Sequence, residues 1–163
     1  ALGKLPVIFI CENNFYSVYS PLSVRQPPER DLTKIAESHG VEAFKSDGND
    51  VVAIYNTAKK AVDKARDSNG PTLLELETYR MLEHCGPNND NHLGYRTEED
   101  YNYWKSNDPL IKLAMKLTEE KNFNQEIQDI TKTINSEIDE AFAYAKSASY
   151  PEKESLYTHL YSK

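Results

Sequence analysis

The chain opens on a continuous apolar run that ends at Cys11 (residues 5–11). Continuous rather than alternating apolar residues are typical of a strand that is buried on both faces, as in a parallel sheet. Two further apolar segments are residues 41–44, which follow Gly40, and residues 72–79, which follow Pro71. We therefore predict three strands in the first half of the chain.

Helical periodicity separates these predicted strands. Residues 31–38 form a short helical segment that Asp31 is suited to cap. Apolar residues in segment 51–65 recur at three- and four-residue spacing, which places them in one stripe along a helix, and Gly70 and Pro71 end it. The order strand, helix, strand, helix, strand predicts an α/β fold with parallel strands and right-handed crossover helices.

The pattern becomes helical throughout after this part. Thr97 and Asp100 form a capping box, and residues 127–145 carry one long amphipathic stripe. We therefore expect two domains, an α/β domain over residues 1–95 and an all-helical C-terminal region over residues 96–163.

Three strands are few for this fold class, in which sheets usually contain about 5–6. A parallel sheet also has two faces to cover and two edges to protect. Because the first predicted strand begins almost at residue 1, we expect a fragment of a larger α/β domain or a subunit that a partner completes.

Composition narrows the classes of partner. The 163 residues include 19 Lys and Arg against 26 Asp and Glu, a net charge of −7. This acidic balance argues against nucleic acid, because neutralising phosphates requires clustered basic residues. The mean hydropathy of −0.71 and the short apolar runs argue against a membrane protein, since a spanning helix needs roughly 20 apolar residues. Two cysteines make no disulfide framework, so a cytoplasmic location is the simplest expectation.

Long polar loops follow the first and the last predicted strands. Ligands of open α/β sheets bind beyond the carboxyl ends of the strands. Because the strands are expected to be parallel, Asn14 in the first loop and His84 in the second are predicted to lie at the same edge of the sheet.

Asn14 and Tyr16 offer hard oxygen ligands. A side-chain oxygen of Asn14 and a backbone carbonyl of Tyr16 would suit Mg²⁺, which takes few protein ligands and completes its shell with water and phosphate oxygens. The alternative is that the asparagine pair only forms a turn, because asparagine hydrogen-bonds its own backbone and tolerates left-handed conformations.

His84 could bind an anion or transfer protons near neutral pH, and the alternative is a surface histidine of a loop. A zinc site formed by His84, Cys85, Asp90 and His92 fits no closed ligand spacing. Cys85 has no base directed at it, so a nucleophilic role is not favoured.

Residues 5–17 resemble the second half of the thiamine diphosphate motif in one family. That family is the alpha subunit of the decarboxylating component of 2-oxo acid dehydrogenase complexes, which includes pyruvate, branched-chain and acetoin dehydrogenases. The resemblance continues in the family's order and spacing through four more segments, at residues 46–55, 70–80, 95–99 and 107–110.

The resemblance implies roles for three residues. Asn14 matches the family's magnesium ligand through its side-chain oxygen, and Tyr16 matches the position whose backbone carbonyl binds the same ion. His84 matches the loop histidine that contacts the diphosphate or the reacting substrate, and so implies both a cofactor-binding and a catalytic role. The family's upstream Gly-Asp-Gly, whose aspartate is the other protein ligand of magnesium, does not occur in this sequence. We therefore expect only the C-terminal portion of such a subunit.

The resemblance also implies thiamine diphosphate and Mg²⁺ as cofactors. The expected reaction is oxidative decarboxylation of a small 2-oxo acid, or cleavage of acetoin, with transfer of the acyl group to a lipoyl-bearing acyltransferase. A beta subunit would complete a heterotetramer and supply the carboxylate that activates the cofactor, so this chain alone is expected to be inactive. The alternative from another class is a non-catalytic α/β binding or regulatory domain that retains the scaffold.

Two positions depart from the family's pattern. Cys85 stands where some complexes carry a phosphorylated serine, so kinase control of that type is not expected. Glu83 places an acidic residue where the family often has a small residue or histidine, which leaves the substrate open.

Overall fold

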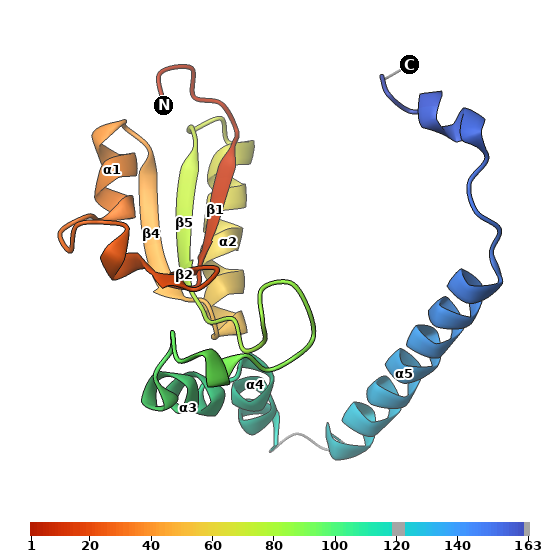
Figure 1. Ribbon diagram of the computed structural model, residues 1–163. Helices are drawn as coiled ribbons and strands as arrows, with labels where there is room; N and C mark the ends of the chain where they lie inside the picture. The colour runs from red at the N-terminus through yellow and green to blue at the C-terminus, as the bar shows by residue number, and fades with distance from the viewer. Residues whose placement is uncertain (119–122, 162–163) are drawn as a thin grey trace. The chain divides into compact units, whose positions relative to one another are not determined.

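The computed structural model describes residues 1–118 and 123–161 (Figure 1). The chain forms two compact units, Ala1–Lys116 and Leu117–Lys163. The first unit contains a three-stranded parallel sheet with the strand order β1-β5-β4. Its strands and the helices that connect them are β1 (Ile8–Asn13), α1 (Leu32–Ser38), β4 (Glu42–Asp47), α2 (Val51–Arg66) and β5 (Thr72–Glu77). The predicted parallel α/β fold with crossover helices is confirmed.

Short elements occupy the two loops at the carboxyl ends of β1 and β5. The first loop contains β2 (Tyr16–Ser17), β3 (Ser20–Pro21) and the 3-10 helix η1 (Leu22–Val24), and β2 pairs with β3 in an antiparallel hairpin. The second loop contains η2 (Asn91–Leu93). The remaining elements are α3 (Glu98–Ser106), α4 (Pro109–Leu117), α5 (Phe123–Ser147) and η3 (Lys153–Tyr157).

Side-chain caps begin the helices where the sequence predicts them. The Asp31 carboxylate accepts hydrogen bonds from the backbone N–H groups of Thr33 and Lys34, and the Thr97 hydroxyl accepts one from the N–H of Asp100. Such caps satisfy backbone donors that have no partner within the helix. The helix starts are therefore encoded locally.

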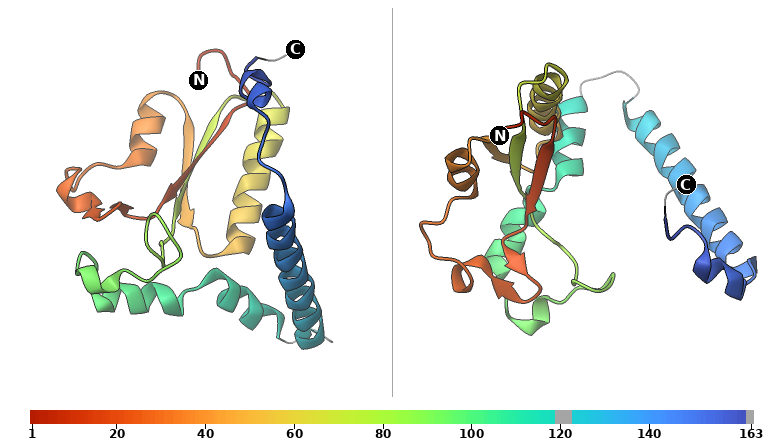
Figure 2. Two further views of the ribbon diagram at one scale, coloured as in Figure 1. Left: turned by 45° about the vertical axis from the view of Figure 1, so that its right-hand side comes forward. Right: turned by 90° about the horizontal axis from the view of Figure 1, so that it is seen from above.

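The core lies between the sheet and α2. Leu74 and Leu76 of β5 pack against Ala61 of α2, with Ile54 and Ala58 beside them. In Figure 2, α1 and α2 lie on opposite sides of the sheet. Since side chains alternate along a strand, β5 directs Leu74 and Leu76 toward α2, whereas Leu73 and the two glutamates point to the side of α1.

The prediction that the first strand is buried on both faces is wrong. β1 lies at the edge of the sheet, and Phe9 and Ile10 are 52% and 59% exposed. The physical reason is the crossover order, which places β1 at the edge, whereas α1 and α2 pack mainly over β4 and β5 and cover less of the faces of β1. A continuous apolar run does not reveal which strand takes the centre.

Helices α3 and α4 extend the first compact unit beyond the α/β elements. The Asn49 side-chain amide donates to the Asn107 carbonyl at 2.8 Å. On α4, the Lys112 ammonium contacts the Asp47 carboxylate at 2.6 Å. The change to helical structure at residue 96 therefore falls inside a compact unit that continues to Lys116.

The second unit consists largely of α5. The amphipathic helix predicted over residues 127–145 lies within it. Its stripe of isoleucines remains exposed, as do the aromatic residues near its end, Phe142 and Tyr144.

Gly48 provides a test of how closely β4 and β5 approach at the carboxyl edge. Its N–H donates to the Glu77 carbonyl at 2.7 Å, and a Cβ at this position would lie 2.6 Å from that oxygen. We expect Gly48→Ala to lower the free energy of unfolding by about 1–3 kcal/mol in urea denaturation, because backbone must move. Gly3→Ala, whose Cβ would meet only Leu5 at 3.8 Å, is the control. Equal midpoints for both variants would contradict the close approach.

Candidate functional site

The loops that follow β1 and β5 leave the sheet at one edge. Asn13 at the end of β1 is paired with Glu77 at the end of β5, and the two strands are parallel. The loops also contact each other, since the Arg80 guanidinium donates to the Val18 carbonyl at 3.0 Å. The predicted convergence of these loops at one edge is confirmed (Figure 1).

Asn14 and Tyr16 form a tight turn at this edge. The Asn14 side-chain oxygen accepts a hydrogen bond from the Tyr16 N–H at 3.0 Å, and Asn13 makes the same bond to Phe15 at 3.1 Å. The backbone is left-handed at Phe15, with φ of 62°, and at Val18, with φ of 57°. Such conformations are uncommon for residues other than glycine, so the surroundings of this hairpin must hold it in place.

The turn leaves acceptor capacity on the two oxygens that are predicted to bind metal, Asn14 Oδ1 and the Tyr16 carbonyl. An amide oxygen has two lone pairs, so the turn bond to Tyr16 leaves Asn14 a second acceptor site. Tyr16 and Pro21 form a non-hydrogen-bonded pair, because the ladder bond runs from the Leu22 N–H to the Phe15 carbonyl at 2.9 Å, so the Tyr16 carbonyl is not used between β2 and β3. Both oxygens can therefore serve as ligands.

These donors fit Mg²⁺ as a partial set. Among residues 1–118 and 123–161 no group of three or more His, Cys, Asp or Glu side chains could hold a metal ion, and this also applies to the zinc cluster considered above. Two neutral oxygens suit a magnesium ion that takes its remaining ligands from water, phosphate and a carboxylate outside this set.

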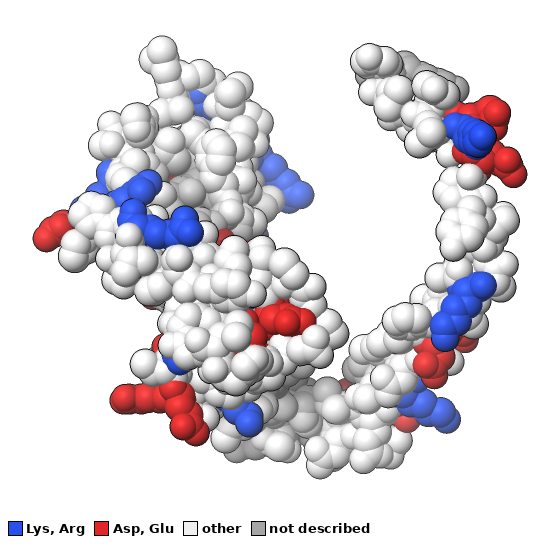
Figure 3. Space-filling view, in the orientation of Figure 1, with Lys and Arg blue, Asp and Glu red and all other residues white. Residues whose placement is uncertain are grey.

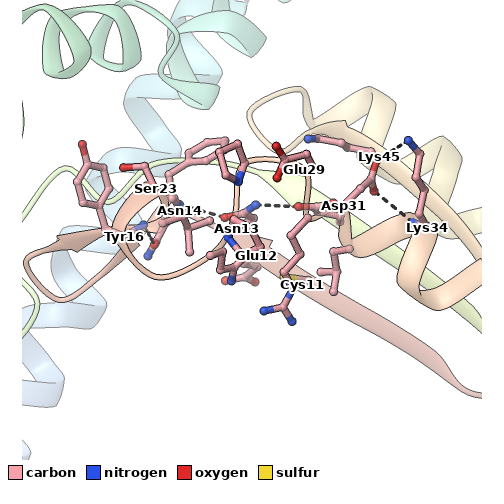
Figure 4. Close-up of a pocket in the computed structure, with 18 residues that line it drawn as sticks. Cys11, Glu12, Asn13, Asn14, Tyr16, Ser23, Glu29, Asp31, Lys34 and Lys45 are labelled. Carbon is pink, nitrogen blue, oxygen red and sulfur yellow. Dashed lines mark hydrogen bonds and ion pairs between the residues drawn. The ribbon is translucent and has the colours of Figure 1, made fainter.

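An open groove of about 720 Å³ extends from the turn along the α1 side of the sheet (Figure 4). Cys11, Glu75 and Lys45 form one rung across the three strands and line it. The remaining wall is the segment from η1 into α1, and Lys and Arg side chains gather on this face (Figure 3).

Glu75 is a buried carboxylate in this groove. It is 4% exposed, and its Oε1 accepts from the Asn13 side-chain amide at 2.7 Å. Burial, followed by the negative charges of Glu75 and Glu12, raises the pKa of the Cys11 thiol. The thiol therefore stays protonated and is a poor nucleophile at neutral pH.

His84 lies outside the groove. All residues that line the groove belong to segments 11–34, 45 and 75, whereas His84 is exposed on the second loop. The same loop uses Glu83 to close on itself, since the Glu83 carboxylate accepts from the Asn88 side-chain amide at 2.8 Å. The structure thus brings the two loops together at the sheet edge, and it gives Glu83 a structural role.

A buried ion pair organises the second loop. The Arg96 guanidinium pairs with the Asp90 carboxylate and also donates to the Arg80 carbonyl. The Tyr95 hydroxyl donates to the other Asp90 oxygen at 2.7 Å and accepts from Arg80 at 2.9 Å. We call Arg80, Asp90, Tyr95 and Arg96 the arginine cluster.

Aromatic rings cover the arginine cluster. The Arg96 guanidinium lies over the rings of Tyr79 and Tyr95, at 5.4 and 4.9 Å from their centroids. Trp104 of α3 stacks on Tyr79 at 5.6 Å and so serves as a packing residue. Burial raises the pKa of the Tyr79 hydroxyl to about 12.

The environment of Asp90 keeps it ionised. Burial acts to raise its pKa, but the hydrogen bond from Tyr95 and the charge of Arg96 outweigh burial, so that the pKa lies below the usual value. Sequence reasoning considered Asp90 only as a zinc ligand and missed its pairing with Arg96. It also missed Glu75, although two glutamates alternating with leucines in an otherwise apolar strand signal a polar face.

No helix in the described part of the chain is long and apolar enough to cross a membrane. Parallel strands, crossover helices on both faces and polar loops at the carboxyl edge define an open α/β domain, a class whose ligands bind beyond the carboxyl ends of the strands. Residues 1–154 match the family described as "Dehydrogenase E1 component". The chain therefore belongs to the dehydrogenase E1 component family.

Curated relatives match along the whole chain. The pyruvate dehydrogenase E1 component subunit alpha of Rickettsia felis is 32% identical over 99% of this chain and 48% of its own length. The 2-oxoisovalerate dehydrogenase subunit alpha of Bacillus subtilis is 34% identical over 100% of this chain and 49% of its own length. The mitochondrial pyruvate dehydrogenase E1 component subunit alpha of Dictyostelium discoideum is 33% identical over 99% of this chain and 42% of its own length. The chain spans about half the length of the curated relatives it matches.

Proposed function

We propose that this chain is part of the alpha subunit of a thiamine diphosphate- and Mg²⁺-dependent dehydrogenase. The subunit would act on a small 2-oxo acid or on acetoin. Family membership and similarity to alpha subunits of pyruvate and 2-oxoisovalerate dehydrogenases support the proposal. The observation that carries it is the pair of oxygen donors, Asn14 Oδ1 and the Tyr16 carbonyl, beyond the carboxyl end of β1.

Two of the three site residues, Asn14 and Tyr16, would anchor rather than react, and His84 would be the residue near the bond changes. Asn14 and Tyr16 would bind the Mg²⁺ that anchors the diphosphate, and thiamine diphosphate supplies the carbanion chemistry when it is bound. His84 would contact the diphosphate or the reacting substrate. Its exposure on the second loop suits a residue that meets a ligand held mainly by other parts of the enzyme.

The remaining machinery belongs to partners. A beta subunit supplies the carboxylate that activates the cofactor, and a lipoyl-bearing acyltransferase takes the acyl group. We expect the enzyme to work in the cytoplasm, where a reducing environment suits the two free cysteines, Cys11 and Cys85. The isolated chain is expected to show no 2-oxo acid decarboxylation in a steady-state assay, and turnover by the isolated chain would contradict this division of labour.

Asn14→Ala tests the proposal in the full-length alpha subunit assembled with its beta subunit. Loss of an outer-shell residue typically weakens metal binding 10- to 100-fold, and a direct ligand contributes at least as much. We expect the Mg²⁺ concentration for half-maximal decarboxylation to rise at least about tenfold. Asn69→Ala, at an exposed asparagine beyond the end of α2, is the matched control.

Two outcomes of this experiment would count against the proposal. One is an Mg²⁺ requirement that Asn14→Ala does not change. The other is an assembled protein that neither binds thiamine diphosphate in a Mg²⁺-dependent manner nor decarboxylates any 2-oxo acid, which would favour the non-catalytic binding or regulatory domain.

A further inference from the structure

The side chain of Tyr16 is held at several points by residues far along the chain. Its hydroxyl donates to the Asp100 carboxylate at 3.1 Å. Its ring meets the rings of Tyr79 and Tyr95 edge to face, at centroid distances of 6.2 and 5.7 Å. Together with the turn bond from its N–H to Asn14, these contacts fix both the backbone and the side chain of one residue.

Asp100 is well placed to act as the fixed end of this link. It lies in the first turn of α3, where its N–H donates to the Thr97 cap at 3.1 Å. The ring of Trp104, one turn further along α3, packs against Phe15 at 5.9 Å and stacks on Tyr79. The first turns of α3 therefore form a packed surface against which the hairpin rests.

The hairpin needs such support because its backbone is strained. Phe15 and Val18, on either side of β2, both have left-handed conformations, and each costs about 1–3 kcal/mol for a residue other than glycine. The Val18 carbonyl is held by Arg80, and the segment between the two strained residues is held through the Tyr16 side chain. Without the second anchor, the direction of the Tyr16 carbonyl would be set by the strained hairpin alone.

We propose that Asp100 is a positioning residue for the metal site: by holding the Tyr16 hydroxyl, it directs the Tyr16 backbone carbonyl toward Mg²⁺. This inference rests on the proposed function, and it assigns to α3 a part in metal binding although no atom of α3 is a ligand. Asp100 acts only through Tyr16, so its removal should weaken metal binding without removing a donor.

The test uses the full-length alpha subunit assembled with its beta subunit, with Mn²⁺ as the probe and Mg²⁺ as its competitor. Mn²⁺ binding is followed by electron paramagnetic resonance in the presence of thiamine diphosphate, without substrate. We expect Asp100→Ala and Tyr16→Phe each to raise the Mn²⁺ dissociation constant about tenfold, as for other outer-shell losses. The double variant should be no weaker than the weaker single variant, because both changes remove one hydrogen bond.

Glu99→Ala is the matched control, since it removes the same charge from the same turn of α3 at an exposed position. Asp100→Glu keeps a carboxylate and should recover part of the affinity. Thermal unfolding in EDTA measures any general loss of stability, which a purely structural role of Asp100 would produce without a change in Mn²⁺ affinity.

The outcomes separate this inference from the function on which it rests. If Asn14→Ala weakens Mn²⁺ binding and Asp100→Ala does not, or if the two single effects add in the double variant, Asp100 is not a positioning residue and the proposed function stands. If Asn14→Ala leaves Mn²⁺ binding unchanged, the metal site itself is wrongly assigned, and both proposals fail.

Discussion

Arg96→Met is expected to lower the free energy of unfolding of the first compact unit by about 3–5 kcal/mol, the usual result of removing one partner from a buried ion pair. The side chains of Arg96 and Asp90 are only 1% and 3% exposed. Methionine fills much of the space of the arginine stem but leaves Asp90 with the Tyr95 hydroxyl as its remaining side-chain donor. Urea denaturation of the full chain, followed by circular dichroism, measures the loss.

The pH dependence of stability gives this prediction a second readout. In the wild-type chain the pKa of Asp90 is lowered, so the unfolded state binds the proton first, and the contribution of Asp90 is lost as pH falls below about 4. In Arg96→Met, burial remains while the cation is gone, so the Asp90 pKa should lie above its unfolded value. The variant should then regain stability on acidification from pH 7 to 5, where the wild type should not.

Asp90→Asn in the Arg96→Met background is the control. Asparagine is neutral, so the double variant should be more stable at pH 7 than Arg96→Met alone and should lack the gain at low pH. A double variant that loses the sum of the two single effects would show that the charge pairing is not what holds these residues.

Local signals made much of this fold predictable. The cap at Asp31, the capping box at Thr97 and the apolar stripe of α2 each act within a few residues, so the elements could be derived from short windows of sequence. The parallel order of the strands followed from their alternation with helices. Short stretches of sequence could not predict the position of each strand in the sheet, because crossover connections allow β5 to insert between β1 and β4.

Only the location of the candidate site at the carboxyl edge of the sheet could be predicted, because strand topology determines it. The parallel strands were enough to bring the Asn14 and His84 loops to one edge, but the groove depends on a wall formed by the segment leading into α1. The pairing of Arg96 with Asp90 depends on the path of the second loop, and the link from Tyr16 to Asp100 joins residues 84 positions apart. Such contacts exist only after the chain has folded, so no spacing rule reveals them.

Leu74→Ala tests whether the two faces of the sheet differ in packing. Leu74 is 1% exposed at the centre of β5 and packs with Ala61 and Leu76 in the core beneath α2. Truncating it should leave a cavity, because the two neighbouring strands prevent the site from collapsing, and we expect a loss of about 2–5 kcal/mol in the free energy of unfolding by urea denaturation.

Leu73→Ala is the matched control, since it makes the same chemical change one residue away. Leu73 is half-buried and directs its side chain to the α1 side, where the open groove lies. Removing it creates less enclosed space, so its cost should be clearly smaller than that of Leu74→Ala. Equal losses would mean that the α1 side is packed as tightly as the α2 side.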